Sequence, residues 1–144
     1  MKISIVFDES LNKDQVEIHV HPQKSDQQAL IQLIESQYQT LNGYQDDRLV
    51  RLKYRDIYYM EAIDEKVILY TKDQTYTSKY RLYQLEDIYP SFIRIHKSMI
   101  VNVEKIKSFR SLLNAKLEAQ LDNGEKVEIN RTYVFALKER MASK

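Results

Sequence analysis

The amino-acid sequence predicts an α+β fold in which short β-strands predominate. Apolar and polar residues alternate in many short runs, as expected for half-buried strands. Val, Ile, Thr and Tyr are dense in these runs, and only three segments have a helical pattern. The chain has 144 residues, of which 43% are hydrophobic and 30% are charged. These values predict a globular protein that is large enough to bury a core.

The first part of the chain, residues 1–47, predicts a β-β-α unit. Alternating runs at residues 3–7 and 16–20 indicate two strands that pair as a hairpin. A helix is expected from Ser25 to Gly43. Ser25 precedes a glutamine by three residues, which is the spacing of a capping box, and a glycine is a typical helix stop.

A second, mostly-β domain is expected over residues 48–144, joined to the first by the polar stretch 43–50. Many short strands are expected in it, with a short helix closed by Pro90 and a second helix near the end. The Asn-Gly pair at 123–124 lies between two alternating runs and predicts a tight hairpin. The segments that predict strands are 48–54, 56–63, 66–73, 74–80, 92–98, 99–111, 116–122 and 126–131, and those that predict helices are 83–90 and 132–141.

The composition argues against most kinds of enzyme site. The chain has no Cys and only two Gly, which excludes disulfides, thiolate zinc sites and glycine-rich phosphate cradles. His19 and His21 share one face of an expected strand, but a third metal ligand is not evident, so we interpret them as exposed strand residues. No run of 18 apolar residues occurs, and the N-terminus does not have the pattern of a signal peptide. We therefore expect a cytoplasmic protein without catalytic activity, cofactor or metal.

Charge is distributed unevenly along the chain. Residues 1–48 contain four Lys and Arg against eight Asp and Glu, whereas residues 91–144 contain eleven against six. This asymmetry hints at a polyanionic partner for the C-terminal part, but the excess is modest, and on charge alone ordinary surface charge is the favoured interpretation.

Three breaks between expected strands or helices carry cations. One is a turn before residue 66, the second is the sequence His-Lys-Ser between two strand-like runs, and the third is the junction of the last strand and the last helix. Cationic and polar side chains at strand ends can donate to phosphates or base edges. The candidate DNA-binding residues are Lys66, His96, Lys97, Ser98, Asn130 and Arg131.

The order of these features resembles the LytTR-type DNA-binding domain of bacterial transcription regulators over residues 49–142. The opening of this span is RDIYYMEAIDEKVILYTKD, and its end is LDNGEKVEINRTYVFALKER. Between them lies YQLEDIYPSFIRIHKSMIVNVEKIKSF, which is similar to the family signature F-x-R-x-H-[KNR]-S-x-[IV]-V-N after a short helix.

The resemblance implies about ten short strands in small sheets and DNA recognition by loops. It also implies a stand-alone regulator without a receiver domain, which binds double-stranded DNA with repeated half-sites as a homodimer, at least on DNA. A small membrane protein that restrains the regulator is a further implied partner. The acidic N-terminal unit is expected to serve association or regulation. Two alternatives stay open: a protein-interaction module of the same fold that does not bind DNA, and a single-stranded nucleic-acid binder that stacks bases on its tyrosines.

Overall fold

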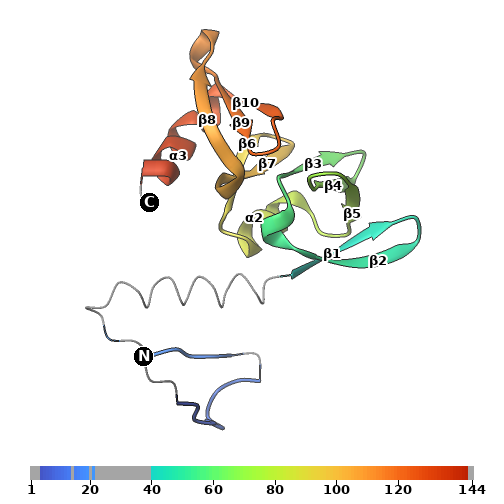
Figure 1. Cartoon of the computed structure of the whole chain (residues 1–144), viewed down its shortest axis with the longest axis vertical. Helices are drawn as coiled ribbons and strands as arrows, with labels where there is room; N and C mark the ends of the chain where they lie inside the picture. Colours follow the sequence, from blue (N-terminus) through green and yellow to red (C-terminus); the bar gives the residue numbers. More distant parts are fainter. Residues whose placement is uncertain (1–3, 14, 20, 22–39, 143–144) are drawn as a thin grey trace. The chain divides into compact units, whose positions relative to one another are not determined.

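The computed structural model describes residues 4–13, 15–19, 21 and 40–142 (Figure 1). The chain divides into two compact units, Met1–Ile34 and Glu35–Lys144. Most of the helix expected from Ser25 lies outside the described residues.

The predicted N-terminal hairpin is wrong for the residues that are described there. Residues 4–8 and 15–19 form no strand, so His19 and His21 are not strand residues either. The apolar side chains of these two segments are exposed to solvent, and Phe7 is 93% exposed. A lone two-stranded hairpin is marginal in water, so an alternating pattern alone does not secure one.

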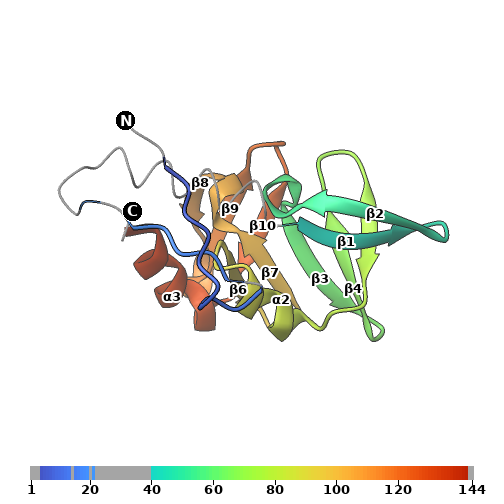
Figure 2. The same cartoon turned by 90° about the horizontal axis from the view of Figure 1, so that it is seen from below.

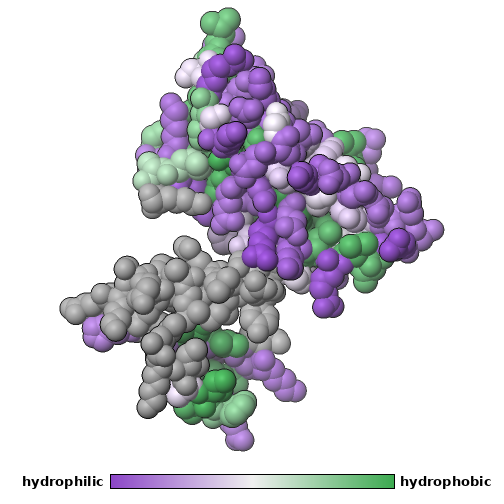
Figure 3. All heavy atoms as spheres, in the orientation of Figure 1, coloured by the Kyte–Doolittle hydropathy of each residue, from purple (hydrophilic) through white to green (hydrophobic). Residues whose placement is uncertain are grey.

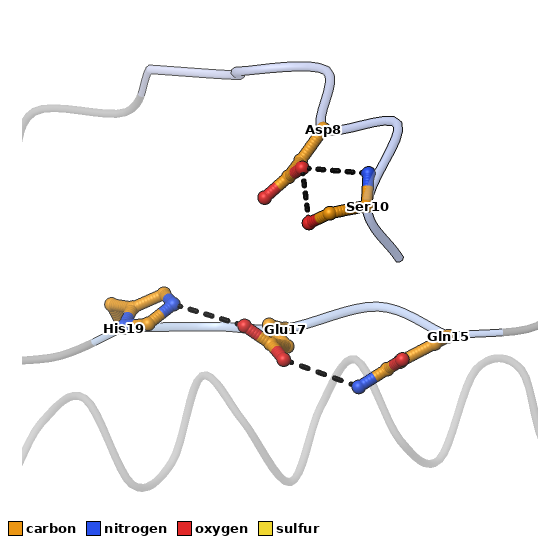
Figure 4. A network of polar contacts seen from close by, with 5 residues as sticks. All are labelled: Asp8, Ser10, Gln15, Glu17 and His19. Carbon is orange, nitrogen blue, oxygen red and sulfur yellow. Dashed lines mark hydrogen bonds and ion pairs between the residues drawn. The ribbon is translucent and has the colours of Figure 1, made fainter. Parts of the chain in front are cut away.

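Local side-chain contacts take the place of strand pairing in this unit (Figure 4). The Asp8 carboxylate accepts hydrogen bonds from the backbone N of Ser10 at 2.9 Å and from its Oγ at 2.6 Å. These bonds lower the pKa of Asp8 from its usual value. Gln15 donates to Glu17, which lies 3.4 Å from His19. Short polar side chains that bond to nearby backbone compete with regular secondary structure.

Within residues 40–142, the second unit contains two antiparallel sheets, two α-helices and three short 3-10 helices, which confirms a mostly-β fold of about ten strands (Figure 1). The larger sheet has seven strands in the order β2-β1-β5-β4-β3-β7-β6, and the smaller has the order β10-β9-β8. The strands are β1 (Thr40–Gln45), β2 (Arg48–Lys53), β3 (Tyr59–Ile63), β4 (Lys66–Tyr70), β5 (Thr75–Ser78), β6 (Phe92–His96), β7 (Met99–Asn102), β8 (Ile106–Ser111), β9 (Leu117–Leu121) and β10 (Lys126–Ile129). The helices are α2 (Leu82–Ile88) and α3 (Arg131–Ala142).

β1 occupies residues that were predicted to end the N-terminal helix. It pairs with β2 along its whole length to form a hairpin that projects from the sheet (Figure 2). The turn consists of Asp46 and Asp47, both with positive φ, of 48° and 65°, as in the two-residue turns that match strand twist. The polar stretch 43–50 is thus a hairpin rather than a joint, and the boundary expected between residues 47 and 48 lies inside it.

Gly43 has a packing role instead of the helix-stop role that was predicted. A Cβ atom added at Gly43 would lie 2.8 Å from Leu52 Cδ1 and 2.9 Å from Tyr76 Cβ. The Leu52 methyl can rotate away, but Tyr76 Cβ is fixed to the backbone of β5. Glycine here permits the close approach of β1 and β5.

The two faces of the large sheet are covered by two separate cores. On β7, Ile100 belongs to the core under α2, and the next residue, Val101, belongs to the core that includes the small sheet and α3. Successive side chains of a strand point to opposite faces, so β7 contributes to both cores. Asn102, at the end of β7, is fully buried and donates from Nδ2 to the Ile57 carbonyl at 3.0 Å.

The two helices are short and lie against these cores. α2 ends before Pro90, as predicted, and α3 buries Leu137 while Phe135 is 75% exposed. Of the helices in the described residues, none is long and apolar enough to span a membrane.

Replacing Gly43 with Ala should destabilise the fold by about 1–3 kcal/mol, because β1 and β5 must separate to admit the methyl group. The matched control is Asn42→Ala, an exposed neighbour in the same strand, which should change stability by less than about 0.5 kcal/mol. Urea unfolding of both variants measures the difference. Equal unfolding midpoints would show that the strands have room for a side chain.

Candidate nucleic-acid interface

The first candidate residue, Lys66, lies beside a tight turn. It is the first residue of β4, is exposed, and pairs with Ile63 at the end of β3. Asp64 and Glu65 make the turn with φ of 49° and 66°. Two consecutive positive φ values suit the twist of a hairpin, but they are unfavourable for residues other than Gly, Asn and Asp, so Glu65 is strained.

Lys97 and Ser98 of the His-Lys-Ser sequence form the turn between β6 and β7, and His96 is the last residue of β6. Lys97 is exposed, whereas His96 and Ser98 are partly buried. Nδ1 of His96 lies 2.9 Å from Ser98 Oγ and accepts from the Ser98 backbone N–H at 3.2 Å. Because Nδ1 is the acceptor, the proton of the neutral ring is on Nε2.

Arg94 holds this turn in place from inside β6. Its Nη1 donates to the Lys97 carbonyl at 2.7 Å, and its Nη2 lies 2.8 Å from Glu86 Oε1 on α2. The β6–β7 register shifts between Arg94 and His96, and such bulges redirect side chains. One guanidinium therefore fixes the Lys97 backbone relative to the adjacent helix.

The first two candidate turns are neighbours in the sheet. β3 pairs with β7, with Glu61 opposite Met99. Beyond that pair, the backbone N–H of Ala62 donates to the Ser98 carbonyl at 2.8 Å. The end of β3 that leads to Lys66 therefore lies directly beside the β6–β7 turn.

The third candidate, the junction of β10 and α3, lies beside β6. The Asn130 backbone N–H donates to the Ile95 carbonyl at 2.9 Å, one residue before His96. The Asn130 side chain accepts from Thr132 N at 3.1 Å and so caps α3. Arg131 is exposed at the start of the helix. The three candidate segments, which are far apart in sequence, therefore lie side by side where these strands end, and this row of strand ends is the edge referred to below.

One exposed cation at this edge was missing from the candidates, Lys79. Val67 pairs with Ser78, so Lys79 follows β5 where Lys66 begins β4. Lys79 Nζ lies 4.7 Å from the centre of the Tyr44 ring. Only the strand register reveals that Lys79 lies near Lys66, because Lys79 does not belong to a turn between paired strands.

Tyrosines on the large sheet contact each other and nearby acids. Tyr59 and Tyr70 stack with ring centres 4.2 Å apart, and Tyr70 OH donates to Glu61 at 3.0 Å. Burial raises the pKa of Tyr59 to about 12, with a further contribution from Glu125. These rings are neutral, internally packed parts of the sheet at physiological pH.

The LytTr DNA-binding domain family matches residues 47–142, which include both candidate turns and the α3 junction. The chain belongs to the LytTR family. This is a family of DNA-binding domains rather than of enzymes.

Relatives cover either the whole chain or the LytTR domain. Uncharacterized HTH-type transcriptional regulators of Staphylococcus aureus, among them one from strain NCTC 8325, are 28% identical over 99% of both chains. The sensory transduction protein LytT of Enterococcus faecalis is 31% identical over 67% of this chain and 40% of its own length. The solved LytTr DNA-binding domain of a Bacillus cereus protein has a TM-score of 0.66 and 29% identity, covering 71% of this chain and 95% of that one.

The two described helices do not form a helix-turn-helix pair. Strands β6 to β10 separate α2 from α3 along the chain. A helix-turn-helix requires two helices joined by a short turn.

Replacing Arg94 with Lys should loosen the β6–β7 turn, because an ammonium cannot reproduce the fork that joins Lys97 to Glu86. We expect a stability loss of about 1–3 kcal/mol and faster hydrogen exchange of the Ser98 amide, measured by NMR. The matched control is Arg110→Lys, since Arg110 is 68% exposed and pairs only with Glu118 among the contacts of the described residues. That change should cost less than about 0.5 kcal/mol. Unchanged exchange at Ser98 in Arg94→Lys would contradict the positioning role.

Proposed function

We propose that this protein is a sequence-specific transcriptional regulator that reads double-stranded DNA through strand-end loops. The observation that carries the proposal is the junction of three cation-bearing segments at one edge. Two backbone hydrogen bonds, Ala62 N to Ser98 O and Asn130 N to Ile95 O, hold the segments together. Rigidly spaced cations can follow the phosphates of a duplex while neighbouring donors reach base edges.

In this proposal the candidate residues have different roles. Lys97 and Arg131, the exposed side chains at two of the segments, contact base edges or phosphates. His96 and Ser98 are already hydrogen-bonded to each other, so they shape the turn. Their hydrogen-bond donors that are not used in this contact face the phosphates of the DNA backbone in this proposal. Lys66 contributes positive charge at the far end of the edge. The cations also steer the protein to DNA, and salt weakens that attraction.

The two alternative functions lead to different binding behaviour. A protein-interaction module of this fold would show no steep salt dependence toward DNA. A single-stranded binder would need rings free to stack on bases. Among the described tyrosines, Tyr59 stacks on Tyr70 and Tyr54 stacks on Tyr89 at 5.8 Å. Tyr80 and Tyr83 are 47% and 66% exposed, so the test must be made on binding itself. Competition between duplex and single-stranded probes distinguishes the two kinds of nucleic acid.

Replacing Lys97 or Arg131 with Ala should weaken specific duplex binding by roughly 1–3 kcal/mol while leaving the fold intact. The specific duplex is first obtained by selecting bound fragments from random DNA, and the affinities are then measured by fluorescence anisotropy.

The matched control is Lys72→Ala. Lys72 is exposed in the turn between β4 and β5, at the opposite end of the sheet from Lys66. Its replacement should change the affinity less than about twofold, as expected for a cation outside the interface. Unchanged affinity in both Lys97→Ala and Arg131→Ala would remove the loop-readout proposal.

Two copies are proposed to bind repeated half-sites as a homodimer on DNA. A single small interface offers few base contacts, so one domain alone has limited specificity. Repeats separated by whole helical turns place both copies on one side of the duplex.

Inserting about 5 bp between the half-sites should abolish cooperative binding, because it rotates one copy by half a helical turn. Inserting about 10 bp should restore part of the cooperativity by returning both copies to the same side. Gel-shift titrations of the three probes measure this. Equal affinity for the parent and the 5-bp probe would rule out same-side cooperation.

The N-terminal unit is proposed to serve association or regulation rather than DNA contact. Its excess of Asp and Glu repels phosphate. The resemblance to stand-alone regulators adds two weaker proposals, a cytoplasmic location and a small membrane protein as the restraining partner.

A further inference from the structure

The turn between β8 and β9, residues 112–116, projects from the same end of the small sheet as the α3 junction. Leu117 pairs with both Ser111 and Ile129, so the end of β8, the start of β9 and the end of β10 lie at one level. Asn130 follows directly after Ile129. The turn continues past that level and is closed by the Leu112 N–H donating to the Lys116 carbonyl at 2.9 Å.

The tip of this turn exposes an apolar side chain at the extremity of the second unit. Leu113 is 87% exposed, and Asn114 and Ala115, also exposed, have φ of 62° and 58°. In Figure 1 the β8–β9 hairpin projects furthest at the top of the unit, and Figure 3 shows hydrophobic surface at that end. A single exposed leucine is common on protein surfaces, and its position at the tip leaves this side chain accessible to a partner.

Two cations flank the tip on the outer face of the small sheet. Lys116 Nζ lies 3.1 Å from Glu128, and Arg110 lies 3.2 Å from Glu118. Both cations remain accessible, with Arg110 68% and Lys116 39% exposed. A tip that pairs an apolar residue with nearby cations suits a nucleic-acid groove, where phosphates border the sugars and base edges.

We propose that residues 112–116 make a fourth contact with the duplex, outside the base pairs reached by Arg131. Leu113 lies against sugars and base edges in the groove, and Lys116 neutralises a neighbouring phosphate. This proposal rests on the proposed function: a duplex lying against Asn130 and Arg131 meets the tip, because the tip projects further from the same sheet end. The partner of the tip is therefore the DNA segment that flanks the half-site.

The charge test compares two lysines of the same sheet. Lys116→Gln should reduce the magnitude of the slope of log affinity against log salt by about 0.9, the value for one phosphate contact. Lys126→Gln is the matched control, because Lys126 is exposed at the opposite end of the sheet, where it pairs with Gln120. The control should keep the parent slope. Equal slopes for all three proteins would overturn the phosphate contact.

The groove test compares two exposed leucines on two probes. Leu113→Ser should weaken binding about three- to tenfold on a single half-site with full flanks, and should have no effect once the flank on the Arg131 side is trimmed by a few base pairs. Leu49→Ser is the control, since Leu49 is 60% exposed on β2, and it should bind both probes as the parent does.

Three other results are informative. Parent-like binding of Leu113→Ser to the full probe overturns the fourth contact. A loss seen only on paired half-sites also overturns it, since the tip would then contact the second copy of the chain. If the parent protein itself binds no duplex, the proposed function fails, and the result is distinguishable from failure of the tip alone.

Discussion

The hydrogen bond from Ala62 N to Ser98 O closes the end of the β3–β7 ladder, and the position of the candidate interface depends on that ladder. β3 belongs to the first half of the LytTR domain and β7 to the second, so their pairing joins segments that are distant in sequence. At the other end, buried Asn102 donates to the Ile57 carbonyl and its backbone N–H donates to the Tyr58 carbonyl. Because an unpaired buried amide is costly, these bonds fix the register.

A fixed register sets the spacing of the cations. A shift by one residue would reverse the faces of β7 and exchange Ile100 and Val101 between two cores, each of which is packed around the other residue. Burial on both faces therefore protects the register, and the register in turn sets where the adjacent turns lie. The loops need no internal core, because packed strands hold both ends of each loop.

The sequence predicted the second domain more completely than the first. Most strands and turns from β2 onward followed from alternation and turn residues, including the hairpin at Gly124, whose φ is 89°. The single strand expected over 99–111 was wrong, because a 3-10 turn at Val103–Lys105 divides it into β7 and β8, which belong to different sheets. β1 was missed because Leu41 and Gly43 fit an apolar helical stripe and a helix stop equally well. Only the approach of Tyr76 reveals the packing reason for Gly43. The N-terminal alternation was misleading because alternation indicates a strand only where a partner strand exists.

The candidate residues were identified from motif positions, whereas the means of holding them required three-dimensional structure. Lys97 lies within the family signature, but its carbonyl is held by Arg94, and nothing in the spacing of the signature links Arg94 to Glu86. Lys79 joins the edge only through the β4–β5 register. Pattern analysis therefore finds exposed side chains at strand ends, while cross-strand hydrogen bonds decide which ends meet. An interface made from several turns consequently depends on the register of the whole sheet, and a substitution deep in β3 or β7 can alter it without touching any candidate residue.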